Sequence, residues 1–136
     1  VSQIKNIEKH VLIKRRNTKN YNEILKNMDL PLRLPTERNN VRSVFWMYGI
    51  IIKNKFFKAD YLAKKLLELG IETRPLFLGM HQQPVLKNMK LFNNQSYPIT
   101  EELSDFGLYL PSGLKLKTSD IKNVCKAVKK VFDEYK

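Results

Sequence analysis

The sequence predicts an α/β (α+β) domain in which a short sheet packs against helices. Residues 43–53 alternate between two apolar sets, which is the period of a β-strand. Residues 58–69 then show the apolar spacing of an amphipathic helix, and residues 71–74 return as a second short strand. A strand, a helix and a strand in immediate succession are typical of α/β proteins.

The composition fits one folded domain, residues 1–136. The hydrophobic fraction of 43% is high enough for the chain to fold around a single core. The longest apolar stretch, residues 44–52, is too short to span a bilayer, and no export signal opens the chain. We therefore expect a cytoplasmic protein with no membrane partner. A single cysteine, Cys125, excludes a disulfide framework.

The net charge of +12 allows two interpretations. A basic surface can bind nucleic acid or other anions, or the lysines can simply cover solvated faces. Only residues 14–16 (Lys-Arg-Arg) are dense enough to form a cluster, and no zinc-finger spacing, RNA-recognition motif or basic zipper accompanies them. Nucleic acid is therefore not the partner that we expect, and a basic nucleic-acid-binding module stays an alternative.

Residues 1–28 are expected to form a leading helix that is capped by Ser2. Its middle, residues 14–20, is entirely polar, so it is either exposed or packs against something that the chain lacks. Its apolar residues recur at helical spacing near both ends; they are Ile4, Ile7, Val11, Ile24, Leu25 and Met28. Residues 29–42, which contain two prolines, should be a linker. The small α/β domain then covers residues 43–136.

The strand at 43–53 has apolar residues on both faces, which predicts a central strand covered on both sides. Its aromatic residues Trp46 and Tyr48 are expected in the core, with stacking on a ligand ring as the alternative. The next helix should end at Gly70, because glycine readily adopts the left-handed conformation that closes a helix.

The rest of the chain should contain four more elements. In order, these are a short helix at 84–90, a helix from Thr100 to Gly107, a brief strand at 108–111 and a last helix from Thr118 or Ser119. The last helix is the clearest, because one stripe is apolar and contains Cys125 while lysines occupy the other face.

The loop after the second short strand gathers the residues with chemical potential. Arg74 suits a phosphate or carboxylate, or it is a surface arginine paired with Glu72 or with a helix end. His81 can exchange a proton, donate a hydrogen bond or be an ordinary loop residue. No second ligand stands at metal-binding spacing, and there is no glycine-rich phosphate loop or nucleophile elbow. The residues alone predict a loop bearing an arginine and a histidine and name no reaction.

Four stretches nevertheless occur together in a recognisable order: residues 44–48 (VFWMY), 70–75 (GIETRP), 80–84 (MHQQP) and 110–113 (LPSG). Together they resemble the C-terminal small domain of the DegT/StrS-type nucleotide-sugar aminotransferases, and most of all its perosamine-synthase-like members. The opening helix, with its Lys-Arg-Arg cluster and Tyr21, is similar to the long helix that leads from the large to the small domain of that family.

The resemblance implies the small C-terminal domain of fold-type-I transferases that depend on pyridoxal phosphate, preceded by a long interdomain helix. Such enzymes move an amino group, usually from glutamate, to a keto sugar nucleotide in surface-polysaccharide or lipopolysaccharide biosynthesis. They work as homodimers. The Schiff-base lysine lies in an N-terminal large domain that is absent from this chain. We therefore expect no catalytic and no cofactor-binding residue here, no metal, and no activity of the fragment alone.

The resemblance also assigns substrate-binding roles. Arg74 matches the arginine of the family's Thr-Arg motif and is expected to contact the anionic part of the ligand. His81 matches the loop histidine and is expected to hydrogen-bond the sugar or diphosphate, with Gln83 and Met80 lining the same loop. Gly79 stands where the family usually has proline, and a glycine there should loosen the loop around His81. The resemblance does not specify the nucleotide, the sugar, the aminated position (3 or 4) or the amino donor. A pure protein-interaction module stays an alternative function.

Overall fold

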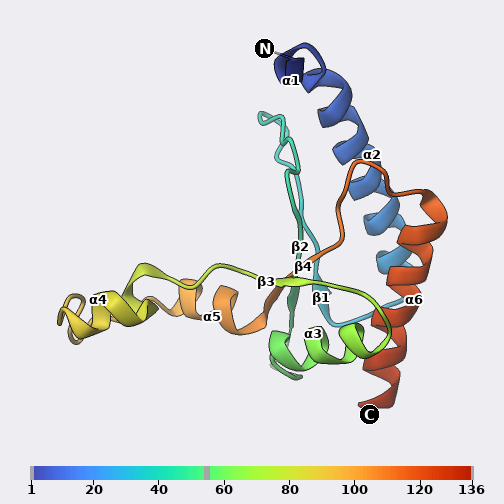
Figure 1. The fold of residues 1–136 in the computed structure, drawn as a ribbon. Helices are drawn as coiled ribbons and strands as arrows, with labels where there is room; N and C mark the ends of the chain where they lie inside the picture. The colour runs from blue at the N-terminus through green and yellow to red at the C-terminus, as the bar shows by residue number, and fades with distance from the viewer. Residues whose placement is uncertain (1, 54–55, 136) are drawn as a thin grey trace.

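The computed structural model describes residues 2–53 and 56–135. Figure 1 shows a small sheet at the centre, with helices α2 and α6 side by side along one flank and helices α4 and α5 projecting away on the other side. The helices are α1 (Ser2–Lys5), α2 (Ile7–Lys26), α3 (Ala59–Glu68), the 3-10 turn η1 (Met80–Gln82), α4 (Pro84–Asn88), α5 (Pro98–Phe106) and α6 (Thr118–Glu134). The strands are β1 (Leu32–Arg33), β2 (Tyr48–Ile52), β3 (Arg74–Pro75) and β4 (Gly107–Leu110).

The sheet has the strand order β1-β2-β4-β3, and every neighbouring pair is antiparallel. Strand β2 is central, as predicted, with Tyr48 opposite Leu110 of β4. Strands β2 and β3 point the same way, but β4 lies between them, so the strand-helix-strand unit is split. The mixed α and β class is confirmed. The range expected as a linker supplies the edge strand β1, because Leu32 is buried and pairs with Ile52.

The core lies between the sheet and helices α2, α3 and α6. The predicted stripe of α6 is confirmed, since Ile121, Val124, Cys125, Val128, Val131 and Phe132 are all buried. Where α2 meets the sheet, the rings of Tyr21 and Tyr48 stack with centroids 4.4 Å apart. Burial raises the pKa of both hydroxyls, which donate to the Pro111 carbonyl and to Asn22 respectively.

The polar middle of the leading helix is partly covered by this chain itself: Asn17 and Thr18 are buried, whereas Arg16 and Lys19 are exposed. It packs against the turn before α6: Asn17 is buried and donates to the Gly113 carbonyl at 3.2 Å, and Asn20 donates to the Thr118 hydroxyl at 3.3 Å. The apolar N-terminal end behaves in the opposite way, because Ile4 and Ile7 are exposed. Neither alternative given for the polar middle describes it fully, because its buried residues pack within this chain.

The strand predicted at 43–53 is shorter, because it begins only at Tyr48. Phe45 has φ of 44°, a left-handed conformation that interrupts an extended chain. The prediction of a core position is correct for Tyr48, which is 1% exposed, and wrong for Trp46, which is 67% exposed. Alternation alone could not reveal where the strand begins.

The predicted ends of helices α3 and α5 agree with the structure to within a few residues. Gly70 has φ of 77° directly after α3, as expected for a left-handed closure. Helix α5 begins at Pro98, two residues before the predicted Thr100, and Gly107 starts β4 where α5 ends. In the described part of the chain, none of the helices has the length and apolar character needed to cross a bilayer.

Candidate functional site

The predicted loop belongs to a segment that we call the limb, residues 76–105, which projects from the sheet (Figure 1). No residue of the limb is buried. The remainder of the described chain from α2 onward, built on the sheet, α2, α3 and α6, is called the body. Arg74 lies on the body as the first residue of β3, which is shifted relative to the strand predicted at 71–74, whereas Met80, His81 and Gln83 lie on the limb.

Arg74 lines a cavity of about 230 Å³ at the sheet edge, together with Met47, Glu72, Thr73, Tyr109, Leu110, Pro111 and Ser112. The alternative of an ion pair with Glu72 is wrong. Among the described residues the guanidinium of Arg74 makes neither an ion pair nor a hydrogen bond, and the side chain is exposed. A guanidinium free of carboxylate partners at a cavity mouth is suited to bind an anion.

A second positive charge stands beside this cavity. The ammonium of Lys14, on α2, donates to the Trp46 carbonyl at 2.9 Å and lies 3.3 Å from the hydroxyl of Ser112, which lines the cavity. Burial lowers the pKa of Lys14. Its described partners are all uncharged oxygen atoms, so its charge adds to that of Arg74.

His81 lies at a different cavity, of about 470 Å³, in the limb. Its Nε2 atom is 3.1 Å from Oε1 of Glu101, and its ring packs against Tyr97 with centroids 4.8 Å apart. The Tyr97 backbone N–H also donates to Glu101, and this bond, followed by the bond from His81, lowers the pKa of the Glu101 carboxyl. Residues that line the same cavity include Gln82, Lys87, Asn93, Asn94, Gln95 and Asp105.

Gly79 does not loosen the loop, contrary to our expectation. Its φ of −61° is an ordinary extended conformation. A Cβ atom here would lie 2.6 Å from Thr100 and 2.7 to 2.8 Å from the ring of His81, so the missing side chain lets both pack against the backbone. The Gly79 N–H donates to Gln82 at 3.0 Å, a bond that proline could not make.

The two other predicted residues contribute less defined contacts. Gln83 donates to the Leu78 carbonyl at 3.4 Å, and the side chain of Met80 is 64% exposed. The cavities of Arg74 and His81 share no described lining residue. The structure therefore does not bring the four residues into one cavity, and their roles as ligand contacts stay predictions.

Sequence reasoning missed Lys14 and Glu101 as site residues. Lys14 was visible only as part of the basic cluster, and Glu101 only as an acidic residue in the first turn of a helix. Each meets its partner through folding, because the sequence separation is 98 for Lys14 and Ser112 and 20 for His81 and Glu101. No local spacing could have indicated either contact.

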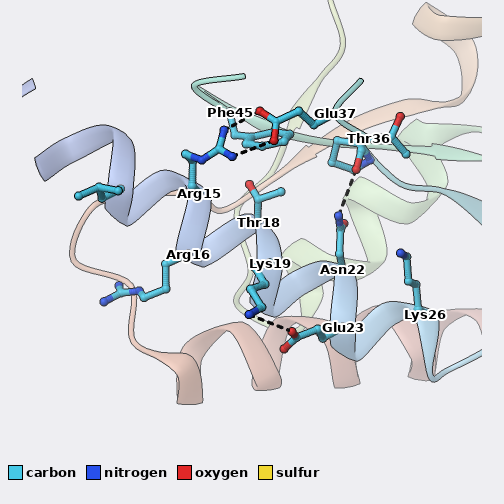
Figure 2. A pocket seen from close by; sticks show the side chains of 12 residues that line it. Arg15, Arg16, Thr18, Lys19, Asn22, Glu23, Lys26, Thr36, Glu37 and Phe45 are labelled. Atoms are coloured by element: carbon cyan, nitrogen blue, oxygen red, sulfur yellow. Dashed lines mark hydrogen bonds and ion pairs between the residues drawn. The ribbon is translucent and has the colours of Figure 1, made fainter. Parts of the chain in front are cut away.

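Figure 2 shows a cavity of about 730 Å³ between α2 and residues 35–45. Arg15 forms a two-pronged ion pair with Glu37, with N–O distances of 2.6 and 2.8 Å, and this pair lowers the pKa of Glu37 to about 2. Arg16 reaches the side chain of Asn17 and the Leu116 carbonyl. Internal contacts thus occupy the one dense basic cluster of the sequence, which weakens the case for a nucleic-acid surface there.

Lys14 is not placed to form a Schiff base with pyridoxal phosphate. Lys14 is the described lysine whose pKa is lowered, but protein oxygens surround its ammonium. A lysine that reacts with a carbonyl must present a free amine to it. We derive no step through the cofactor from this chain. The described residues also contain no group of three acidic, histidine or cysteine side chains that could hold a metal.

Known proteins match both the sequence and the fold. A family profile described as the DegT/DnrJ/EryC1/StrS aminotransferase family matches residues 1–129. The GDP-perosamine synthase of Vibrio cholerae is 28% identical over 134 residues, which are 98% of this chain and 35% of that protein. The enzyme of the same name from Caulobacter vibrioides is 28% identical over 133 residues, 97% of this chain and 35% of that protein.

Solved structures share the fold at lower identity. PseC of Helicobacter pylori, an aminotransferase involved in the biosynthesis of pseudoaminic acid, has a TM-score of 0.85 at 20% identity and covers 98% of this chain and 35% of its own. The sugar aminotransferase Spr1654 of Streptococcus pneumoniae, in its PLP-form, has a TM-score of 0.85 at 13% identity and covers 99% of this chain and 34% of its own. The fold is therefore the small α/β domain of fold-type-I sugar aminotransferases.

The chain spans about a third of the length of the curated relatives that it matches. The profile match nevertheless extends over nearly all of its residues. The chain belongs to the DegT/DnrJ/EryC1/StrS aminotransferase family.

Proposed function

We propose that this chain is the small-domain part of an aminotransferase that uses pyridoxal phosphate to move an amino group from an amino acid, usually glutamate, to a keto sugar nucleotide. The parent enzyme acts in the cytoplasm as a homodimer, in surface-polysaccharide or lipopolysaccharide biosynthesis. Support comes from the family match over residues 1–129 and from relatives whose names identify them as GDP-perosamine synthases.

The observation that carries a substrate-binding role is the cationic cavity at the sheet edge. Arg74 faces it without a carboxylate partner, and the ammonium of Lys14 lies behind Ser112 on its wall. A diphosphate is the part of a nucleotide sugar that two such charges would attract. We assign the anionic part of the ligand to this cavity, and the sugar to His81, Gln83 and Met80 on the limb.

The limb supports the view that the chain is one part of a larger enzyme. Its exposed large apolar residues are Phe77, Leu78, Met80, Val85, Met89, Leu91, Tyr97 and Ile99. Apolar surface on this scale marks a contact with other protein. The relatives carry about two thirds of their length outside the matched region. We propose that this remainder is the large domain, that it covers the limb, and that it supplies the cofactor lysine.

Under this proposal the cofactor supplies the chemistry of amino transfer, and this chain binds and orients the substrate. Arg74 fixes the diphosphate, and the limb holds the sugar beside it. The isolated chain is then inactive. Adding pyridoxal phosphate and reducing with borohydride should leave no lysine labelled in stoichiometric amount, as mass spectrometry of the digested chain would reveal. One lysine labelled to completion would contradict the assignment of the cofactor site to the large domain.

Binding of nucleoside diphosphates to the 136-residue chain tests the role of Arg74. Titrations with GDP and UDP, followed by NMR, should give weaker binding for Arg74→Gln by about 10-fold or more, because hydrogen bonds to a charged group contribute roughly 1.5–3 kcal/mol. The matched control is Arg33→Gln, which removes an arginine on the opposite edge strand that pairs with Glu102. Equal affinities for the wild type and Arg74→Gln would remove Arg74 from the site.

A further inference from the structure

Glu101 is the structural partner of His81 that the proposed substrate site leaves unexplained. Its Oε1 atom lies 3.1 Å from Nε2 of His81, and the imidazole is only 10% exposed. The ring also packs against Tyr97 on one side and against the backbone of Gly79. The histidine is therefore held in one orientation by three residues of the limb, two of them at the start of α5.

The chemistry of the pair decides which ring nitrogen carries the proton. An ionised carboxylate only accepts hydrogen bonds, so Nε2 of a neutral His81 must carry its hydrogen toward Glu101. The contacts that lower the pKa of Glu101 keep it ionised at neutral pH. The other nitrogen, Nδ1, then holds a lone pair and can only accept.

Gly79 lets the imidazole pack closely against its backbone on the Nδ1 side. A Cβ atom on residue 79 would lie 2.8 Å from Nδ1, inside the contact distance of the two atoms. Among the described residues, no hydrogen bond to Nδ1 is present. The wall of the adjoining cavity carries the amide side chains of Asn93, Asn94 and Gln95, which suit a ligand rich in hydroxyl groups.

We propose that Glu101 is a positioning residue that keeps the proton of His81 on Nε2, which leaves Nδ1 to accept a hydrogen bond from a ligand hydroxyl, and that Gly79 provides the room in which the ring holds this orientation. The ligand part rests on the proposed function, in which this hydroxyl belongs to the sugar of a nucleotide sugar. An Nδ1 atom that can only accept favours the sugar over the diphosphate as the partner of His81. The sugar hydroxyls can donate a hydrogen bond, whereas phosphate oxygens at neutral pH only accept.

A purely local role for Glu101 must be distinguished from this proposal. Its carboxylate also accepts the Tyr97 N–H at the start of α5, so it could simply stabilise that helix. The two roles differ in one measurable property, the hydrogen bond on the imidazole. If Glu101 only stabilised α5, replacing it would change the helical signals of α5. The Nε2 proton of His81 would then exchange rapidly with water in the wild type and in every variant.

The first experiment is NMR of the 15N-labelled 136-residue chain above neutral pH. The wild type should show a slowly exchanging, downfield Nε2-bound proton of His81, in contact with the Tyr97 ring. The signal should vanish in Glu101→Ala and be restored in part in Glu101→Gln, whose amide oxygen can still accept. The matched control is Glu102→Ala, which removes the neighbouring carboxylate that pairs with Arg33 and should keep the signal. A signal that is absent from the wild type, or retained in Glu101→Ala, overturns the positioning role.

The second experiment compares binding of UDP-glucose with UDP, and of GDP-mannose with GDP. Gly79→Ala should weaken binding of the nucleotide sugars about 2- to 10-fold, the value of one neutral hydrogen bond, and leave the nucleoside diphosphates unchanged. Gly113→Ala is the control, because a Cβ atom there meets nothing within 4 Å. An equal loss for sugars and diphosphates overturns the hydroxyl assignment. Absence of all binding overturns both that assignment and the proposed function, whereas the Nε2 proton still decides the role of Glu101.

Discussion

The body and the limb are stabilised by different interactions. In the body, buried apolar side chains from α2, α3, α6 and the sheet pack into one cluster. In the limb no side chain is buried, and hydrogen bonds connect its turns. Gln82, for example, accepts from the Gly79 N–H at 3.0 Å and from the Ser104 hydroxyl at 2.8 Å. The body therefore has its own source of stability, whereas the limb depends on a few polar contacts and on whatever covers it.

Thiol labelling should reveal the largest difference between the two regions. Cys125 is fully buried in α6, and burial raises the pKa of its thiol to about 12. Its reaction with a disulfide reagent should be roughly 10³-fold slower than in the unfolded chain, because unfolding constants of small domains limit access. A cysteine placed on the limb by Met80→Cys, in a Cys125→Ala background, should react at nearly the unfolded rate. Fast labelling of Cys125 in the native chain would mean that the body opens as easily as the limb.

Truncating a leucine should cost much more in the body than in the limb. Leu66, on α3, is 0% exposed, so Leu66→Ala should lower the free energy of unfolding by about 2–5 kcal/mol. Leu91 in the limb is 45% exposed, and Leu91→Ala should change it by less than ~0.5 kcal/mol. Urea unfolding followed by circular dichroism measures both. Similar losses in the two variants would break the distinction between body and limb.

The junction between the two regions should be sensitive to one methyl group. A Cβ atom on Gly107 would lie 2.3 Å from the Leu103 carbonyl oxygen and 2.8 Å from the side chain of Leu76. Gly107→Ala should therefore lower the unfolding free energy by about 1–3 kcal/mol, the usual cost of overpacking. Gly113→Ala, in an open turn of the body, serves as its control. A Gly107→Ala variant as stable as the wild type would show that the limb can shift freely relative to the sheet.

The smallest effect concerns the exposed ion pair of Arg15 and Glu37. The pKa of Glu37 is lowered from 4.5 to about 2 in the folded chain, so the pair stabilises the fold above pH 4.5 and loses this effect as the pH falls toward 2. The stability difference between the wild type and Glu37→Gln should shrink over that interval. Glu23→Gln, which removes a looser pair with Lys19 at 3.8 Å, should show less change. A difference that is constant with pH would contradict the shift.

The sequence correctly predicted the helices and helix ends that depend on residues close together in the chain. The apolar stripe of α6 and the closure of α3 at Gly70 follow from the spacing of neighbouring residues, and both are confirmed. The order of four short motifs between residues 44 and 113 was enough to identify the family. Arg74 was also recognisable as a candidate anion contact, since it stands where a strand opens into a loop.

Errors arose where a residue's environment comes from distant parts of the chain. Trp46 and Tyr48 have the same place in the alternating pattern, yet only Tyr48 enters the core, because a left-handed Phe45 delays the start of β2. Gly79 looked like a flexible position, but the neighbours that require a glycine include Thr100, which is 21 residues further along. Such contacts do not appear in a local pattern.

The predicted loop shows the same division. The sequence by itself determined its residue types, the family to which they point, and the absence of a glycine-rich phosphate loop or metal-ligand spacing. Only the tertiary structure decided that Arg74 and His81 face separate cavities, that Lys14 adds its charge to the first, and that Glu101 holds the histidine in the second. The reason is physical: charge and hydrogen bonding act over a few ångströms in space, and folding brings together partners as far apart in sequence as Lys14 and Ser112.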